Sequence, residues 1–143
     1  LSLRRQRQMC IRDSSLDYVI VIGGHNDAFK LDSIGGIDNF KAKLEILCKG
    51  LVEKYSTAKI FFFTRWNCKN FKESDSEKVV DAMVEVCGNY SIPIFDCARK
   101  GGIYADNDTF RRIYFQGEKD TAHLNAKGHV RFLKVAENFI LQY

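Results

Sequence analysis

The feature that most constrains the fold is a short unbroken apolar run at residues 18–22, YVIVI, which two glycines at 23–24 end at once. The run is rich in β-branched residues, which is typical of a strand buried on both faces of a parallel sheet. Three polar residues, HND at 25–27, follow the glycines. Open α/β sheets bind their ligands at the carboxyl ends of such strands. The stretch therefore predicts one edge of a functional site.

Downstream of this run, strand-like and helix-like patterns alternate. Strands are expected where short apolar runs recur, at residues 58–64 and 92–95. Helices are expected where apolar residues recur at steps of three and four, at residues 37–55, 73–90 and 126–141. Polar stretches predict loops at residues 28–36 and 96–121. Alternation at this spacing predicts βαβ units, a parallel sheet and right-handed crossovers.

The chain has 143 residues, which is enough for one domain with a single core. Its hydrophobic fraction of 45% and charged fraction of 28% are ordinary for a globular protein, and no apolar run is long enough to span a bilayer. We therefore expect an α/β protein with a three-layer α/β/α, flavodoxin-like parallel sheet. Residues 15–143 resemble the carboxyl-terminal portion of one such domain, so the sheet is expected to be incomplete.

The first 14 residues differ in character from the rest. They carry four arginines, one aspartate and no periodicity, and a basic arm of this kind would suggest contact with nucleic acid or a membrane. Residues 9–14, MCIRDS, instead resemble the translation of a transposon end used in sequencing adapters, so residues 1–14 are interpreted as a non-native segment. Without those five charged residues the net charge falls from +4 to +1, and the case for a nucleic-acid partner largely disappears.

The cysteines give a weak indication of the cellular compartment. Cys10 lies in the non-native segment, which leaves Cys48, Cys68, Cys87 and Cys97, none of them with the C-x-x-C spacing of a metal site. Two of the four fall on the apolar stripes of predicted helices, so buried free thiols are expected. Reduced cysteines slightly favour a cytosolic protein. The natural protein is expected to begin upstream, so the lack of a signal peptide says nothing about export.

Two polar islands border predicted elements: residues 24–27, GHND, after the first strand, and residues 120–123, DTAH, before the last helix. An aspartate three residues before a histidine can fold back within one turn and accept the Nδ1 proton. Asp120 would thus fix the tautomer of His123 and leave its Nε2 as a general base. The amide of Asn26 can donate to a developing oxyanion, provided that the two loops meet. Together the islands predict a hydrolytic site.

Each island has a simpler interpretation when it stands alone. Asn26 and Asp27 could form only a turn or a helix cap after the glycines. Asp120 could cap the last helix, which would leave His123 solvated. His129 lies within that helix and is expected on its surface or in its packing. The two islands together, on the right elements and in this chain order, favour the catalytic interpretation.

This combination resembles the SGNH/GDSL hydrolase superfamily, which contains GDSL-like lipases, acylhydrolases and esterases. Residues 24–27 match its third block, G-x-N-D, and residues 120–123 match its fifth block, D-x-x-H. Residues 124–129, LNAKGH, resemble the family's usual entry into its final helix. The resemblance covers about residues 17–143 and implies a serine ester hydrolase that needs neither a cofactor nor a metal.

The resemblance also implies roles for individual residues. The asparagine of the third block is an oxyanion-hole donor in the family, and the fifth block carries the acid and base of the catalytic triad. These roles fall on Asn26, Asp120 and His123 in this sequence, with Gly24 and Asp27 as supporting residues. The substrates are expected to be small-molecule, carbohydrate or lipid esters.

The chain departs from the family pattern at its start. The Gly-Asp-Ser block with the nucleophilic serine has no counterpart, and neither has the glycine of the second block. Ser14 and Ser15 precede a strand instead of following one, so neither is expected to be the nucleophile. One or two βα units are therefore expected to be missing, since a βαβ motif needs roughly 30 residues or more. The fragment itself is expected to be inactive.

Several alternatives stay open at the level of the sequence. Trp66 follows the second predicted strand, where it is either a wall of the substrate pocket or a partly buried core aromatic. The protein could also be a non-catalytic α/β module that binds a ligand such as a glycan. A metal-dependent phosphoesterase using Asp27, Asp120 and His123 is weaker, because such enzymes usually cluster more carboxylates or histidines. Neither the ester substrate nor the oligomeric state follows from the sequence.

Overall fold

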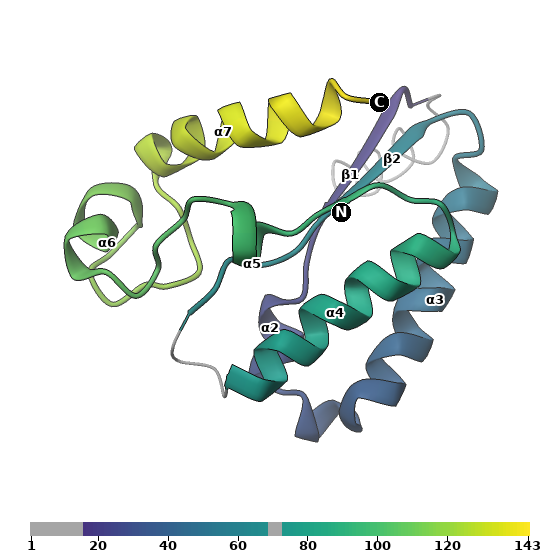
Figure 1. Ribbon diagram of the computed structural model, residues 1–143, viewed down its shortest axis with the longest axis horizontal. Helices are drawn as coiled ribbons and strands as arrows, with labels where there is room; N and C mark the ends of the chain where they lie inside the picture. The colour runs from purple at the N-terminus through teal and green to yellow at the C-terminus, as the bar shows by residue number, and fades with distance from the viewer. Residues whose placement is uncertain (1–15, 69–72) are drawn as a thin grey trace, which may run out of the picture.

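The computed structural model describes residues 16–68 and 73–143, which form a three-layer α/β/α arrangement (Figure 1). The predictions about residues 1–14 and about Ser14 and Ser15 fall outside these residues. Within them, three parallel strands form one open sheet of order β1-β2-β3. The strands are β1 (Tyr18–Ile22), β2 (Lys59–Phe63) and β3 (Ile94–Phe95). The predicted incomplete flavodoxin-like fold is confirmed.

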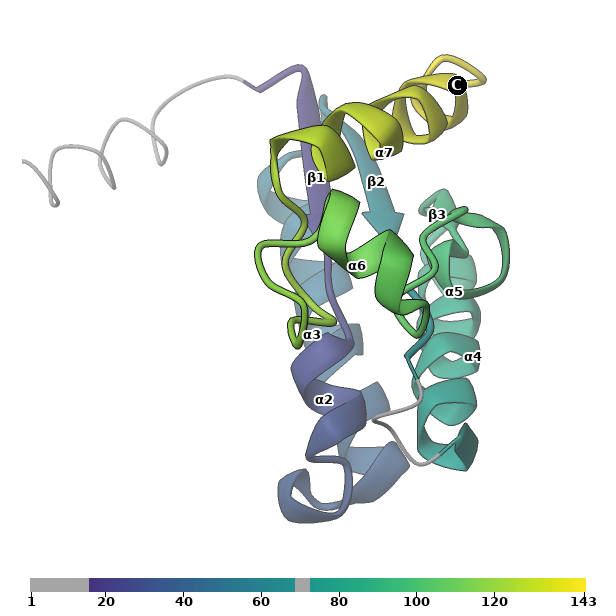
Figure 2. The same cartoon turned by 90° about the vertical axis from the view of Figure 1, so that its left-hand side faces the viewer.

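Helices cover both faces of this sheet. In the described part of the chain they are α2 (His25–Phe29), α3 (Gly36–Lys54), α4 (Glu73–Asn89), α5 (Cys97–Lys100), α6 (Asp108–Tyr114) and α7 (Ala126–Ile140), with a short 3-10 helix η1 (Asp32–Ile34). Helices α3 and α4 lie on one face and α7 lies on the other (Figures 1 and 2). The three long helices match the predicted ranges to within one residue at each end. None of the described helices has the length and apolar content needed to cross a membrane.

The prediction of a loop over residues 96–121 is wrong, because α5 and α6 lie within it. Each of these helices begins at a side-chain N-cap. Asp96 accepts a hydrogen bond from the Arg99 backbone N–H at 3.0 Å, and Asn107 accepts one from the Phe110 backbone N–H at 2.8 Å. Such caps satisfy donors that the start of a helix leaves open. Helices of four and seven residues are too short to show a clear apolar period.

The core lies on both faces of β2. Phe63 faces α7, where its ring packs edge-on against Phe132 and Phe139 at centroid separations of 5.8 and 5.4 Å. Successive strand residues point to opposite faces, so Phe62 faces α3 and α4. The buried core residues contributed by α3 and α4 include Phe40, Leu44, Cys48, Val79, Met83 and Cys87. Two packed layers of side chains therefore hold the sheet between the helices.

The four described cysteines are buried and free, as the sequence predicted. Burial raises the pKa of the Cys97 thiol to about 12, with a smaller contribution from the neighbouring Asp96 carboxylate. Burial also raises the pKa of Cys87, which faces Cys48 across the contact between α3 and α4. A thiol held in its neutral form is a poor nucleophile, so these residues act as small apolar side chains.

Strand β1 is an edge strand and is not buried on both faces, which corrects the prediction from its apolar run. Its register with β2 places Tyr18, Ile20 and Ile22 on the same face as Phe61 and Phe63, toward α7. Each of these three residues is between 51% and 54% exposed. Within the described residues, no strand pairs with the outer edge of β1. The run is apolar enough for an interior strand, but the described structure does not cover it.

Candidate active site

The first part of the site is the turn that joins β1 to α2. Gly24 is the N-cap of α2 and has a left-handed backbone with φ of 89°. A Cβ atom at this position would lie 2.8 Å from the Sδ atom of Met83. Glycine is therefore favoured both by the backbone conformation and by close packing against α4. Asn26 and Asp27 follow inside the first turn of α2, so the alternative in which they cap this helix is wrong.

The second part of the site is the loop before α7. The Asp120 carboxylate accepts hydrogen bonds from the backbone N–H groups of Ala122 and His123 at 2.8 and 2.9 Å. Its Oδ2 atom lies 3.0 Å from Nδ1 of His123, which is the folded-back geometry expected for D-x-x-H spacing. The N-cap of α7 is Asn125, whose Oδ1 accepts from the Gly128 backbone N–H. The alternative in which Asp120 caps the last helix is therefore wrong.

The electrostatics of this turn favour an ionised Asp120. Partial burial by itself would raise the pKa of the carboxyl group. Hydrogen bonds from the backbone of His123 and Ala122, and from the imidazole, outweigh that effect and leave the pKa below its ordinary value. The His123 side chain is 72% exposed, whereas that of Asp120 is 25% exposed. A largely covered carboxylate thus holds Nδ1, while the imidazole stays accessible from solvent.

The two parts meet in one pocket of about 260 Å³. Its lining residues come from the β1–α2 turn, the end of β2 and the loop before α7, and are Ile22, Gly23, His25, Asn26, Arg65, Trp66, Ala122 and His123. Asn26 and His123 therefore line the same cavity, as the catalytic interpretation of the two polar islands requires. Gly24 and Asp27 do not line it: Gly24 shapes the turn, and Asp27 lies one residue beyond Asn26 on α2. Asp120 reaches the pocket through His123.

His25 and Arg65 line the pocket, although the sequence predicted a role for neither of them. Partial burial, followed by the charges of Arg65 and His123, lowers the pKa of His25. Arg65 is only 2% exposed, and its burial lowers its pKa to about 10, so the guanidinium is charged at neutral pH. Each residue adjoins one that the sequence had singled out, Asn26 for His25 and Trp66 for Arg65. Their position next to those residues, just after a predicted strand, was the one sign in the sequence that they could line the pocket.

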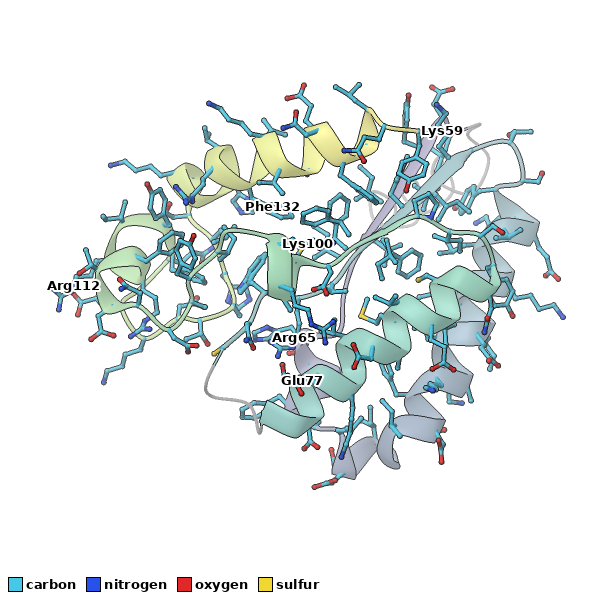
Figure 3. All side chains as sticks on the ribbon, viewed as in Figure 1. Lys59, Arg65, Glu77, Lys100, Arg112 and Phe132 are labelled. Carbon is cyan, nitrogen blue, oxygen red and sulfur yellow. The ribbon has the colours of Figure 1, made fainter. Side chains whose placement is uncertain are left out.

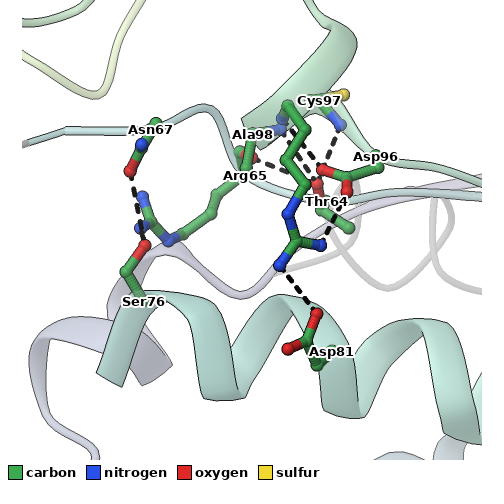
Figure 4. Close-up of polar contacts among 9 residues, drawn as sticks. Thr64, Arg65, Asn67, Ser76, Asp81, Asp96, Cys97 and Ala98 are labelled. Carbon is green, nitrogen blue, oxygen red and sulfur yellow. Dashed lines mark hydrogen bonds and ion pairs between the residues drawn. The ribbon is translucent and has the colours of Figure 1, made fainter. Parts of the chain in front are cut away.

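Arg65 joins the end of β2 to α4 (Figures 3 and 4). Its Nη1 donates to the Trp66 carbonyl at 2.6 Å, and its Nη2 donates to the hydroxyl of Ser76 on α4. The preceding residue, Thr64, accepts a hydrogen bond from the Cys97 backbone N–H at 2.9 Å, at the start of α5. The segment from which Trp66 projects is thus attached to helices that follow both β2 and β3.

Trp66 lines the pocket and is also a partly buried aromatic packed against the core. Its Nε1 donates to the Thr121 carbonyl at 3.0 Å. Its ring lies edge-on to Phe115 and Phe132, at centroid separations of 6.3 and 6.1 Å. The side chain therefore spans the distance between β2 and the loop that carries His123.

The described residues do not support a metal-dependent phosphoesterase. Across residues 16–68 and 73–143, no group of three or more His, Cys, Asp or Glu side chains is placed to hold a metal ion. Asp27, Asp120 and His123 are therefore not gathered as that hypothesis requires.

No protein-family model and no curated protein sequence matches the chain. One solved crystal structure is 24% identical and has a TM-score of 0.70, covering 88% of this chain and 64% of that protein. A protein from Lactobacillus plantarum is 22% identical with a TM-score of 0.73, covering 99% of this chain and 73% of that one. A candidate GDSL-like lipase from Parabacteroides merdae is 12% identical with a TM-score of 0.61, covering 95% and 66%. These similarities show the α/β fold, and the chain spans between 64% and 73% of the lengths of these proteins.

Proposed function

We propose that the intact protein is a serine ester hydrolase of the SGNH/GDSL type and that this chain carries its base, its orienting acid and one oxyanion donor. One observation carries the proposal. His123, held at Nδ1 by Asp120, faces the same pocket as Asn26 at the carboxyl end of a parallel sheet. The base and acid of a catalytic triad, together with a donor to the oxyanion, need this arrangement.

In the proposed mechanism the serine of a Gly-Asp-Ser segment attacks the acyl carbon of an ester. Nε2 of His123 accepts the serine proton, and the Asp120 carboxylate stabilises the imidazolium that forms. The amide of Asn26 donates to the oxyanion of the tetrahedral intermediate. His123 then gives its proton to the leaving alcohol, and a water molecule repeats the sequence to release the acid. No cofactor is needed for any of these steps.

The open edge of β1 is where the segment that carries the serine is proposed to pair with the sheet. A parallel strand that pairs with this edge would end beside Ile22 and Gly23, which already line the pocket. Its side chains would cover the half-exposed face of Tyr18 and Ile20. A nucleophile just after such a strand would therefore reach the cavity that His123 and Asn26 share.

The similarity to a candidate GDSL-like lipase from Parabacteroides merdae is compatible with this function, because that protein has the same fold and extends beyond the part that this chain covers. The proposed substrates are small carboxylic esters, among them acetylated carbohydrates and lipid-like esters. A pocket of about 260 Å³ has room for a small acyl group.

The test is to obtain the natural upstream sequence and to assay the longer protein. We expect a Gly-Asp-Ser segment after a buried strand, labelling of its serine by a fluorophosphonate, and hydrolysis of p-nitrophenyl acetate. The present chain should hydrolyse this ester no faster than its His123→Ala variant, because it lacks the group that forms the acyl-enzyme. An upstream sequence without such a serine would contradict the proposal and favour a non-catalytic ligand-binding module.

A further inference from the structure

We propose that Trp66 is a positioning residue of this site: its indole N–H fixes the loop of Asp120 and His123 relative to the carboxyl end of the sheet. The inference rests on the proposed function, because it concerns the placement of the same acid–base pair. It adds a residue that neither motif contains. The hydrogen bond from Trp66 Nε1 to the Thr121 carbonyl joins residues 55 positions apart in the chain.

The loop before α7 is anchored at its two ends by backbone hydrogen bonds. The Gln116 N–H donates to the His123 carbonyl, and the Asn125 N–H donates to the Tyr114 carbonyl, both at 2.9 Å. These bonds tie the loop to the end of α6 and to the start of α7. They do not tie it to β1 or β2, where the Asn26 side of the pocket begins. A separate contact must therefore set the distance between the two sides.

Trp66 supplies such a contact at the centre of the turn. The carbonyl that it binds belongs to Thr121, which directly follows Asp120 and lies two residues before His123. Trp66 also lines the pocket between the Asn26 side and the His123 side. Its indole thus connects the end of β2 to the loop at Thr121, which lies between the acid Asp120 and the base His123 in the sequence.

Trp66 can hold the loop because it is itself held. Its ring packs edge-on against Phe115 and Phe132, which are 3% and 7% exposed. Its backbone carbonyl accepts the hydrogen bond from the buried Arg65, which is also bonded to Ser76 on α4. The indole therefore holds the loop in a fixed position relative to the sheet and to α4.

His123 depends on such a contact because packing does not fix it. Its side chain is 72% exposed, so hydrogen bonds and the shape of its loop decide where the imidazole lies. In catalysis a displacement of about 1 Å can cost about 10²-fold in rate. A loop free to move relative to β2 would lose its alignment with Asn26 and would open its local hydrogen bonds to Asp120 more often.

The composition of the chain allows a sharp test, because Trp66 is its one tryptophan. Biosynthetic replacement of tryptophan by 3-benzothienylalanine puts sulfur in place of the indole N–H and keeps the ring shape. Replacement by 5-fluorotryptophan keeps the N–H and is the matched control. Amide hydrogen exchange at Ala122 and His123 reports on the loop, since both N–H groups bind Asp120.

We expect exchange at Ala122 and His123 to be about fivefold faster with benzothienylalanine than with fluorotryptophan, the scale of one lost hydrogen bond. Exchange at Phe62, whose N–H donates to the Pro93 carbonyl inside the sheet, should be the same in both proteins. Equal loop exchange in the two proteins would overturn the inference. So would faster exchange at Phe62 by the same factor, because the analogue would then have loosened the whole fold.

Activity in the longer, serine-containing protein gives a second measurement. Trp66→Phe keeps a ring and removes the donor, so kcat should fall about 10- to 100-fold with KM unchanged. A rise in KM at constant kcat would make Trp66 only a wall of the pocket and would overturn the positioning role. If that protein hydrolyses no ester even with Trp66 in place, the proposed function fails, and the exchange measurement alone decides whether Trp66 positions the loop.

Discussion

Nδ1 of His123 lies 3.0 Å from Oδ2 of Asp120, and the same carboxylate accepts the His123 backbone N–H at 2.9 Å through its other oxygen. The acid therefore holds both the ring and the backbone of the base within a single turn. These hydrogen bonds are made to the ionised carboxylate and lower its pKa. The stability of the fold should consequently depend on the protonation of Asp120.

The first prediction concerns pH. The folded chain lowers the pKa of Asp120 from its ordinary value of 3.8. Its contribution to stability is therefore fully present above about pH 4 and is lost as the pH falls through the lowered pKa. Wild type should exceed Asp120→Asn in free energy of unfolding at neutral pH, and this difference should shrink in acid. Urea unfolding followed by Trp66 fluorescence measures it, with Asp38→Asn on α3 as the control. A difference that stays constant with pH would contradict the account.

The second prediction separates backbone strain from close packing in the β1–α2 turn. Gly24 and Gly36 both have positive φ, 89° and 79°, but only at Gly24 would an added Cβ meet neighbours, at 2.8 Å from Met83 and 3.2 Å from Val79. Gly36→Ala should lower the free energy of unfolding by about 1–2 kcal/mol, the cost of a left-handed alanine. Gly24→Ala should cost about 1–3 kcal/mol more, because the core must also accommodate a methyl group. Urea denaturation compares the two variants, and equal losses would show that Met83 moves aside freely.

The third prediction concerns the uncovered edge of β1. An apolar edge strand without a charge invites pairing with another chain, and a lysine in the strand opposes it. Ile20→Lys should therefore raise the fraction of soluble monomer in size-exclusion chromatography with light scattering. Ile46→Lys is the matched control, because Ile46 is exposed on α3 at 66%, compared with 51% for Ile20. A wild-type chain that is already monomeric and melts cooperatively would show that the edge needs no cover.

The fourth prediction concerns Asn26 in the longer protein that includes the serine. Asn26→Ala should lower kcat by about 10²–10³-fold, the usual loss for one oxyanion donor, because its amide would act only in the transition state. Asn138→Ala, on α7 and outside the pocket, should leave kcat unchanged. An effect of Asn26→Ala on KM alone would mean that the amide binds the ground state of the substrate and would exclude the oxyanion role.

The sequence could predict those parts of the site that depend on local geometry. The Asp120–His123 turn follows from a spacing of three residues, and the limits of β1 follow from one apolar run between Asp17 and two glycines. The burial of β1 could not be predicted in the same way. An apolar pattern shows what a strand is able to pack against, whereas Ile20 and Ile22 are about half exposed within the described structure.

Other features depend on contacts between distant residues. The Trp66–Thr121 hydrogen bond spans 55 positions, and the burial of Arg65 arises only when α4 packs near the end of β2. The helix α6 depends on an Asn107 cap, which in the sequence is one polar residue among several in a polar stretch. Periodicity contains no information about such contacts. The sequence therefore predicted the two loops that carry Asn26 and His123, and it gave no role to His25 or Arg65.

The most direct measurement of the central claim is the turnover of p-nitrophenyl acetate by the serine-containing protein with and without its proposed base. His123→Ala should lower kcat by several powers of ten, because the serine would lose the group that accepts its proton. His129→Ala is the matched control, since His129 is an exposed histidine on α7 and does not line the pocket, and it should keep wild-type turnover. Full esterase activity in the His123→Ala protein would contradict the role assigned to His123, and with it the proposed mechanism.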